Sequence, residues 1–251
     1  MMSDTSRPSG LSASPPDGPP ADRPDRPSTG RRPGPQGGPP LLAPALAYGA
    51  LMIAGVILSA RTPQPSAAAT DVLSYVRAHH TELQVAGFLS FGAAAPLAIW
   101  SATVYRRLRT LGITAPGAVI ALAGGLLSAA SLALSGLIGW TSAQSASVAD
   151  PALAKALAYL GFAAGSAGFV VPLGLLLAGV SVPALIQRLT PRPWAWFGLV
   201  VAAVSVLSTV TLLTSALDPT LPVGRFGSLV FLVAVSLLLP RSRHALRGSV
   251  A

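Results

Sequence analysis

Six apolar stretches, each about long enough to cross a lipid bilayer, alternate with short polar segments along most of this chain. They lie at residues 41–60, 83–104, 116–140, 156–182, 194–216 and 220–239. At about 1.5 Å per helical residue, a stretch of roughly 20 residues spans the ~30 Å hydrocarbon core of a membrane. The strands of a membrane barrel would instead alternate apolar and polar residues. The pattern predicts an all-α fold, an integral membrane bundle of six transmembrane helices.

The composition agrees with a bilayer as the main solvent of this chain. Hydrophobic residues make up 51% of it and charged residues only 10%, whereas a soluble domain carries about 25% charged residues. The net charge of +9 comes without a basic stripe of interleaved aromatics, so we expect no nucleic-acid partner. The chain has no cysteine, which excludes disulfides, thiolate catalysis and cysteine metal sites.

The two ends differ in composition from the apolar part. Residues 1–40 hold eleven of the prolines and few apolar side chains, so this segment cannot bury enough surface to offset its chain entropy. We predict a disordered tail at 1–40, a six-helix membrane domain at 41–240 and a short basic tail at 241–251. The proline-rich tail is either an unselective tether or a recognition segment for a partner.

The charges of the connecting segments predict an orientation in the membrane. The segments after the second, fourth and sixth spans carry arginines and no acid, whereas basic and acidic residues balance in the others. These arginines are Arg106, Arg107, Arg109, Arg188, Arg192, Arg241, Arg243 and Arg247. The positive-inside rule therefore predicts that both termini lie in the cytoplasm. The abundance of Ala, Gly, Pro and Arg and the single lysine lead us to expect a bacterial plasma (inner) membrane. Arg225, one turn into the sixth span, is expected to extend outward to the interface.

The connection between the first two spans carries a polar cluster. From Thr70 the pattern predicts a short interfacial helix, or an outward extension of the second span, with Val72, Leu73, Val76 and Leu83 on one face. His79, His80 and Glu82 follow. His79 and Glu82 share a helix face and could contribute to a metal site, but two ligands do not close one. We interpret the cluster as interfacial and predict no metal and no cofactor.

The predicted membrane cores contain no Asp, Glu, Lys or His, and ionisable side chains at this depth are the usual marks of proton relays and ion paths. Pro96 and Pro172 lie near the middle of the second and fourth spans. We predict helix kinks at both, acting either as packing features or as gating hinges. Small residues are dense in the third and fourth spans, which favours close packing within one bundle or a homodimer.

Several short stretches between about residues 71 and 240 carry a resemblance. They are VLSY at 72–75, SATV at 101–104, RTLG at 109–112, LSGL at 134–137, VPLG at 171–174, GVSVP at 179–183 and PRPW at 191–194. Through them the chain resembles a group of multi-pass actinobacterial-type membrane proteins. That group has no assigned activity, so the resemblance implies the membrane fold and no mechanism.

The functional prediction is a non-enzymatic inner-membrane protein, an accessory or regulatory subunit, with no catalytic residues. Its expected partners are the lipid bilayer and a second copy or another membrane protein. The alternative is a permease or binder of a neutral or lipidic molecule, held in an apolar cavity near Pro96 and Pro172. An enzyme would need the cluster of His79, His80 and Glu82 to converge with Asp150 or Asp218.

Overall fold

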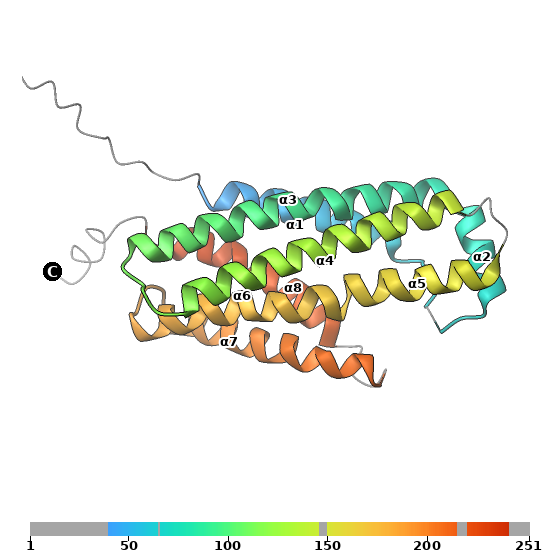
Figure 1. Ribbon diagram of the computed structural model, residues 1–251. Helices are drawn as coiled ribbons and strands as arrows, with labels where there is room; N and C mark the ends of the chain where they lie inside the picture. The colour runs from blue at the N-terminus through green and yellow to red at the C-terminus, as the bar shows by residue number, and fades with distance from the viewer. Residues whose placement is uncertain (1–39, 65, 146–149, 215–219, 241–251) are drawn as a thin grey trace, which may run out of the picture. The chain divides into compact units, whose positions relative to one another are not determined.

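The computed structural model describes residues 40–64, 66–145, 150–214 and 220–240, and its regular elements are all helical. Figure 1 shows the spanning helices packed side by side. The elements are α1 (Leu42–Ser59), α2 (Ala69–Ala78), α3 (His80–Thr110), α4 (Gly117–Ser145), α5 (Pro151–Gly165), α6 (Ala167–Ile186), α7 (Arg192–Leu207), the 3₁₀ helix η2 (Ser208–Leu212) and α8 (Thr220–Leu238). The predicted all-α class is confirmed. Both predicted tails, apart from Pro40, lie outside the described residues.

Within the described ranges, six helical segments are long and apolar enough to cross a membrane, as predicted. They are α1, α3, α4, α5 continuing into α6, α7 continuing into η2, and α8. The sixth, which has the shortest charge-free run, begins at Thr220. Pro222 therefore falls in its first turn, where a missing N–H breaks no helical hydrogen bond.

The fourth span is interrupted at Ser166, six residues before the predicted kink at Pro172. Ser166 has φ −100° and ψ −99°, outside the helical region, and separates α5 from α6. Gly165 precedes it and Gly168 follows, and glycine is a poor helix former. α6 runs unbroken through Pro172, and α3 runs unbroken through Pro96. Bends at the two prolines stay predictions.

α6 occupies the centre of the described bundle. It contacts α4, α5, α7 and α8, and the span that α5 and α6 form together is 61% buried over its apolar part, against 33–39% in the other spans. Its buried side chains include Phe169, Leu173, Leu176 and Leu177. The other helices keep one face exposed, as lipid-facing helices do.

Neighbouring helices approach so closely that their backbones touch at glycines. A Cβ added to Gly136 of α4 would lie 2.6 Å from the backbone nitrogen of Phe91 and 2.7 Å from the carbonyl oxygen of Gly87, both on α3. A Cβ on Gly179 of α6 would lie 2.6 Å from the carbonyl oxygen of Gly117 on α4. The small residues therefore pack helices within the bundle, which was one of the two predicted roles.

Two of the helices are longer than the hydrocarbon core of a membrane. α3 has 31 residues and α4 has 29, about 46 Å and 43 Å at 1.5 Å per residue, against ~30 Å. Their extra turns lie with α2 and α5, at the end opposite the short α3–α4 turn (Figure 1). α2 buries Val72, Leu73 and Val76 there, which belong to the face predicted from the sequence.

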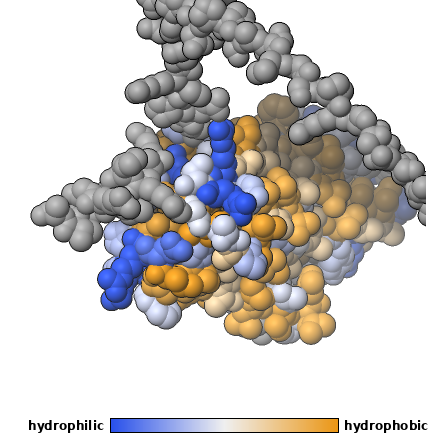
Figure 2. Space-filling view, turned by 60° about the vertical axis from the view of Figure 1, so that its left-hand side comes forward, coloured by the Kyte–Doolittle hydropathy of each residue, from blue (hydrophilic) through white to orange (hydrophobic). Residues whose placement is uncertain are grey.

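The two ends of the described bundle differ in charge, because acidic side chains mix with basic ones such as Arg77 and Lys155 at one end and arginines alone gather at the other. The described acidic residues, Asp71, Glu82 and Asp150, lie in α2, in the first turn of α3 and at the N-cap of α5. The opposite end holds the arginines that follow the second and fourth spans, which are Arg106, Arg107, Arg109, Arg188 and Arg192. Figure 2 brings the latter end forward and shows hydrophilic side chains gathered on it, with hydrophobic surface along the flanks. We call it the basic end.

Candidate functional site

Arg225 is a charged side chain that lies among the spanning helices. It lies in the second turn of α8, where its Nη2 donates a hydrogen bond to the carbonyl oxygen of Gly165. The guanidinium carbon also lies 5.5 Å from the centroid of the Phe169 ring, within the range of a cation–π interaction. Arg225 therefore turns toward α5 and α6, and the prediction that it extends outward to the interface is wrong.

The helix break at Ser166 explains why the carbonyl oxygen of Gly165 lacks its usual hydrogen-bond donor within the helix. In a continuous helix the Gly165 carbonyl would accept from the N–H of Phe169. Here the Phe169 N–H bonds to the carbonyl of Ser166 at 3.2 Å, and the Val170 N–H bonds to the same oxygen at 2.8 Å. A cation at this place also complements the negative C-terminal end of α5. Arg225 therefore satisfies a carbonyl that the break leaves inside the bundle.

Two buried hydroxyl groups near this break make no hydrogen bond among the described residues. They belong to Tyr48 of α1 and Ser205 of α7. Tyr48 is fully buried near Arg225, and the Ser205 oxygen would lie 2.9 Å from a Cβ on Gly224, the neighbour of Arg225. The hydrogen bond to Gly165 holds the Arg225 guanidinium at the junction of α5, α6 and α8, which is a structural role.

The predicted polar cluster forms no metal site among the described residues. His79 stacks on Tyr75, with ring centroids 4.3 Å apart, and its Nδ1 lies 3.2 Å from the Tyr75 carbonyl oxygen. The His80 Nε2 lies 3.2 Å from the hydroxyl of Thr81. Glu82 is exposed in the first turn of α3. Each imidazole therefore makes its contact with a residue close to it in the sequence, Tyr75 for His79 and Thr81 for His80.

An enzyme would need Asp150 or Asp218 to lie beside His79, His80 and Glu82, and the structure describes only the first of these two carboxylates. Asp150 caps the N-terminus of α5, where its Oδ1 accepts from the N–H of Ala152 at 2.9 Å. Asp218 lies outside the described residues. No described residue group combines three or more histidine and carboxylate side chains in a metal-binding arrangement.

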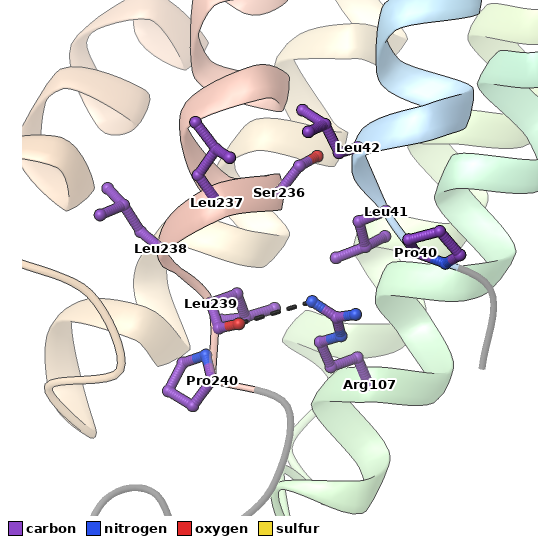
Figure 3. Close-up of a pocket in the computed structure, with 9 residues that line it drawn as sticks. All are labelled: Pro40, Leu41, Leu42, Arg107, Ser236, Leu237, Leu238, Leu239 and Pro240. Atoms are coloured by element: carbon purple, nitrogen blue, oxygen red, sulfur yellow. Dashed lines mark hydrogen bonds between the residues drawn. The ribbon is translucent and has the colours of Figure 1, made fainter. Parts of the chain in front are cut away.

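A pocket of about 360 Å³ opens at the basic end. The start of α1, the last turns of α3 and the end of α8 line it, as Figure 3 shows. Arg107 enters from α3, and its Nη1 donates a long hydrogen bond, 3.4 Å, to the carbonyl oxygen of Leu239. Ser236 supplies the hydroxyl in the lining, and the rest is leucine and proline. The pocket combines one cation with an apolar wall.

A second hollow, of about 490 Å³, follows the outer face of α8. It extends from Leu229 to Leu238 and includes Trp194 of α7. Leu237 and Leu238 belong to both hollows, so the second one begins where the pocket ends. We call it the α8 groove. Neither hollow includes Pro96 or Pro172, where the predicted ligand cavity was placed.

No protein-family model, curated protein or solved structure matches this chain. The resemblance to actinobacterial-type membrane proteins therefore stays a prediction, and the site has to be interpreted from its own geometry. Sequence reasoning used Arg107 only as one of several basic residues that orient the chain. The signal it missed is the position of Arg107, three residues before the end of α3, where a side chain can turn back toward the bundle.

Proposed function

We propose that the chain is a multi-pass protein of a bacterial plasma membrane, with both termini in the cytoplasm and a non-enzymatic accessory or regulatory role. The observation that carries this proposal is the close packing of the spanning helices. A Cβ on Gly124 of α4 would lie 2.6 Å from the carbonyl oxygen of Pro172 on α6. Such contacts leave no room for a substrate path between these two helices.

The buried serines support the same proposal. Ser101 donates to the carbonyl of Leu97 and Ser128 to that of Gly124, both at 2.8 Å and both within their own helix. A pathway for polar solutes would be lined by hydroxyls that converge on a shared space. These two instead satisfy backbone groups four residues earlier, which is a packing role.

The difference in charge between the two ends supports the orientation, because basic segments are retained in the cytoplasm. Reporter fusions test it. A fusion after Arg109 should report a cytoplasmic position, and a fusion after Arg77, in the connection between the first two spans, should report an external one. An external signal after Arg109 would contradict the proposed orientation.

The accessory role is tested by reconstitution. Liposomes that contain the purified chain should neither take up solutes nor convert them chemically. Cross-linking in native membrane should join the chain to one membrane protein, or to a second copy, in a fixed ratio. Uptake of a solute by liposomes that contain only this chain would contradict an accessory role and favour a permease.

The second candidate function is the binding of a lipidic molecule. The pocket at the basic end favours it, because a cation and an apolar wall meet there and the α8 groove continues from it. Such a site matches an amphiphile, whose polar and apolar parts need different surroundings. The basic end, and not the surroundings of Pro96 and Pro172, is therefore where this function would reside.

A further inference from the structure

We propose that the pocket at the basic end and the α8 groove together bind one anionic phospholipid, with its phosphate at Arg107 and one acyl chain along α8. This inference deepens the lipid-binding candidate and rests on the proposed membrane placement. Three observations carry it, namely the charge of the pocket, the polarity of the helix ends that line it, and the apolar lining and length of the groove.

The charge of the pocket selects an anion. Arg107 is partly buried and is the charged residue of the lining. The described acidic residues lie at the other end of the bundle. A guanidinium presents a planar set of N–H donors that matches a phosphate. Basic pockets between membrane helices on the cytoplasmic side are suited to anionic lipid headgroups.

The polarity of the helix ends in the lining agrees with this assignment. The pocket includes the start of α1, whose N-terminus has no side-chain cap, and a helix N-terminus favours an anion. The C-terminal carbonyl of Leu239 would repel one, but it accepts a hydrogen bond from Arg107. The same guanidinium lines the pocket, so it offsets this carbonyl at the place where a phosphate would sit.

The groove matches one acyl chain in polarity, exposure and length. All its lining residues are apolar except for the indole N–H of Trp194. Leu237 is 65% exposed and Val230 is 50% exposed, so lipid can reach this face of α8 from outside the bundle. From Leu229 to Leu238 the helix rises about 14 Å, close to the ~15 Å of hydrocarbon in one leaflet.

The two hollows fix the direction of the bound lipid. They meet at Leu237 and Leu238, with the pocket at the end of α8 and the groove running back toward its middle. Trp194 lines the groove from the first turn of α7, and an indole is favoured at the level of the headgroups. A phosphate at Arg107 therefore places its acyl chain inside the hydrocarbon layer, as bilayer lipids require.

The experiment uses the full chain, purified in a neutral detergent and offered phosphatidylglycerol or phosphatidylcholine, with retained lipid counted by native mass spectrometry. Wild type should retain phosphatidylglycerol in preference to phosphatidylcholine. Arg107→Gln should weaken this retention by at least about tenfold, the factor that corresponds to ~1.4 kcal/mol. The matched control is Arg109→Gln, which removes the same charge from an exposed residue two positions away and should change retention by less than about twofold.

The groove is tested separately, which keeps the proposal falsifiable if Arg107→Gln fails to fold. Val230→Trp places bulk over the groove and should reduce phosphatidylglycerol retention. Val223→Trp, at an equally exposed position of α8 outside the lining, should not. Equal retention of phosphatidylglycerol by the two arginine variants, or by the two valine variants, would overturn the proposal. Another segment of the chain or a protein partner would then be the occupant of these hollows.

The membrane placement on which this inference rests is tested by a separate measurement. Failure of the wild-type chain to insert into phosphatidylcholine nanodiscs would contradict the membrane placement itself, and this inference would fall with it. Insertion without any preference for phosphatidylglycerol would overturn the lipid site alone.

Discussion

Arg225 on α8 donates a hydrogen bond to the carbonyl oxygen of Gly165, at the point where α5 ends and α6 begins. The two residues are 60 positions apart in the chain. The bond joins the last spanning helix to the interruption in the fourth, and it gives the charge of Arg225 a partner. A charged side chain inside a membrane protein is costly unless it is paired in this way.

Replacing Arg225 should therefore destabilise the bundle. We expect Arg225→Ala to lower the free energy of unfolding by about 1.5–3 kcal/mol, the usual contribution of a hydrogen bond to a charged group. Arg225→Lys should lose less, because it keeps the charge and a donor. The measurement is unfolding of the detergent-solubilised chain. Arg77→Ala, at an exposed arginine of α2, is the control, and an equal loss in both variants would show that the bond to Gly165 contributes nothing.

Close backbone contact between α3 and α4 predicts that a methyl group is not tolerated at Gly87. A Cβ there would lie 2.8 Å from the carbonyl oxygen of Gly136 and 2.8 Å from the backbone nitrogen of Trp140. Gly87→Ala should lower the midpoint of thermal unfolding, at a cost of about 1–3 kcal/mol from overpacking. Gly92→Ala, in the same helix, would meet only a leucine methyl at 3.9 Å and should leave stability unchanged or raise it.

Trp100 and Ser236 form a hydrogen bond that links α3 to α8. The indole N–H donates to the serine oxygen at 2.9 Å, and the serine hydroxyl donates to the carbonyl of Leu232 at 2.7 Å. A double-mutant cycle of Trp100→Phe and Ser236→Ala should give a coupling free energy of about 0.5–1.5 kcal/mol, the range found for hydrogen bonds between membrane helices. Additive effects of the two substitutions would show that the pair is not coupled.

The contacts of His79 predict that it acts through packing. His79→Ala removes the stack on Tyr75 and should increase protease cleavage within the segment that links α2 to α3. Zinc should not change this cleavage in wild type, because the imidazole is engaged with Tyr75. His80→Ala, which removes a more exposed imidazole, should have a smaller effect. Protection of wild type by zinc, absent from both variants, would restore the metal-site hypothesis for this cluster.

Properties that depend on neighbours along the chain were predictable from the sequence. The six spanning segments, the start of α8 at Thr220 and the buried face of α2 all agree with it. Transfer of apolar side chains into hydrocarbon depends on composition and length, and the position of a residue on a helix face depends on a fixed period. The difference in charge between the two ends follows from the same local pattern.

The arrangement of backbone groups from distant segments was decided only by the tertiary structure. The interruption lies at Ser166 and not at Pro172, and the carbonyl it exposes is satisfied by Arg225, 60 positions away. Arg107 likewise meets Leu239, 132 positions away, and so becomes part of a pocket. Composition specifies which segments enter the membrane, whereas the partners of the buried polar groups depend on which helices pack together and at what depth.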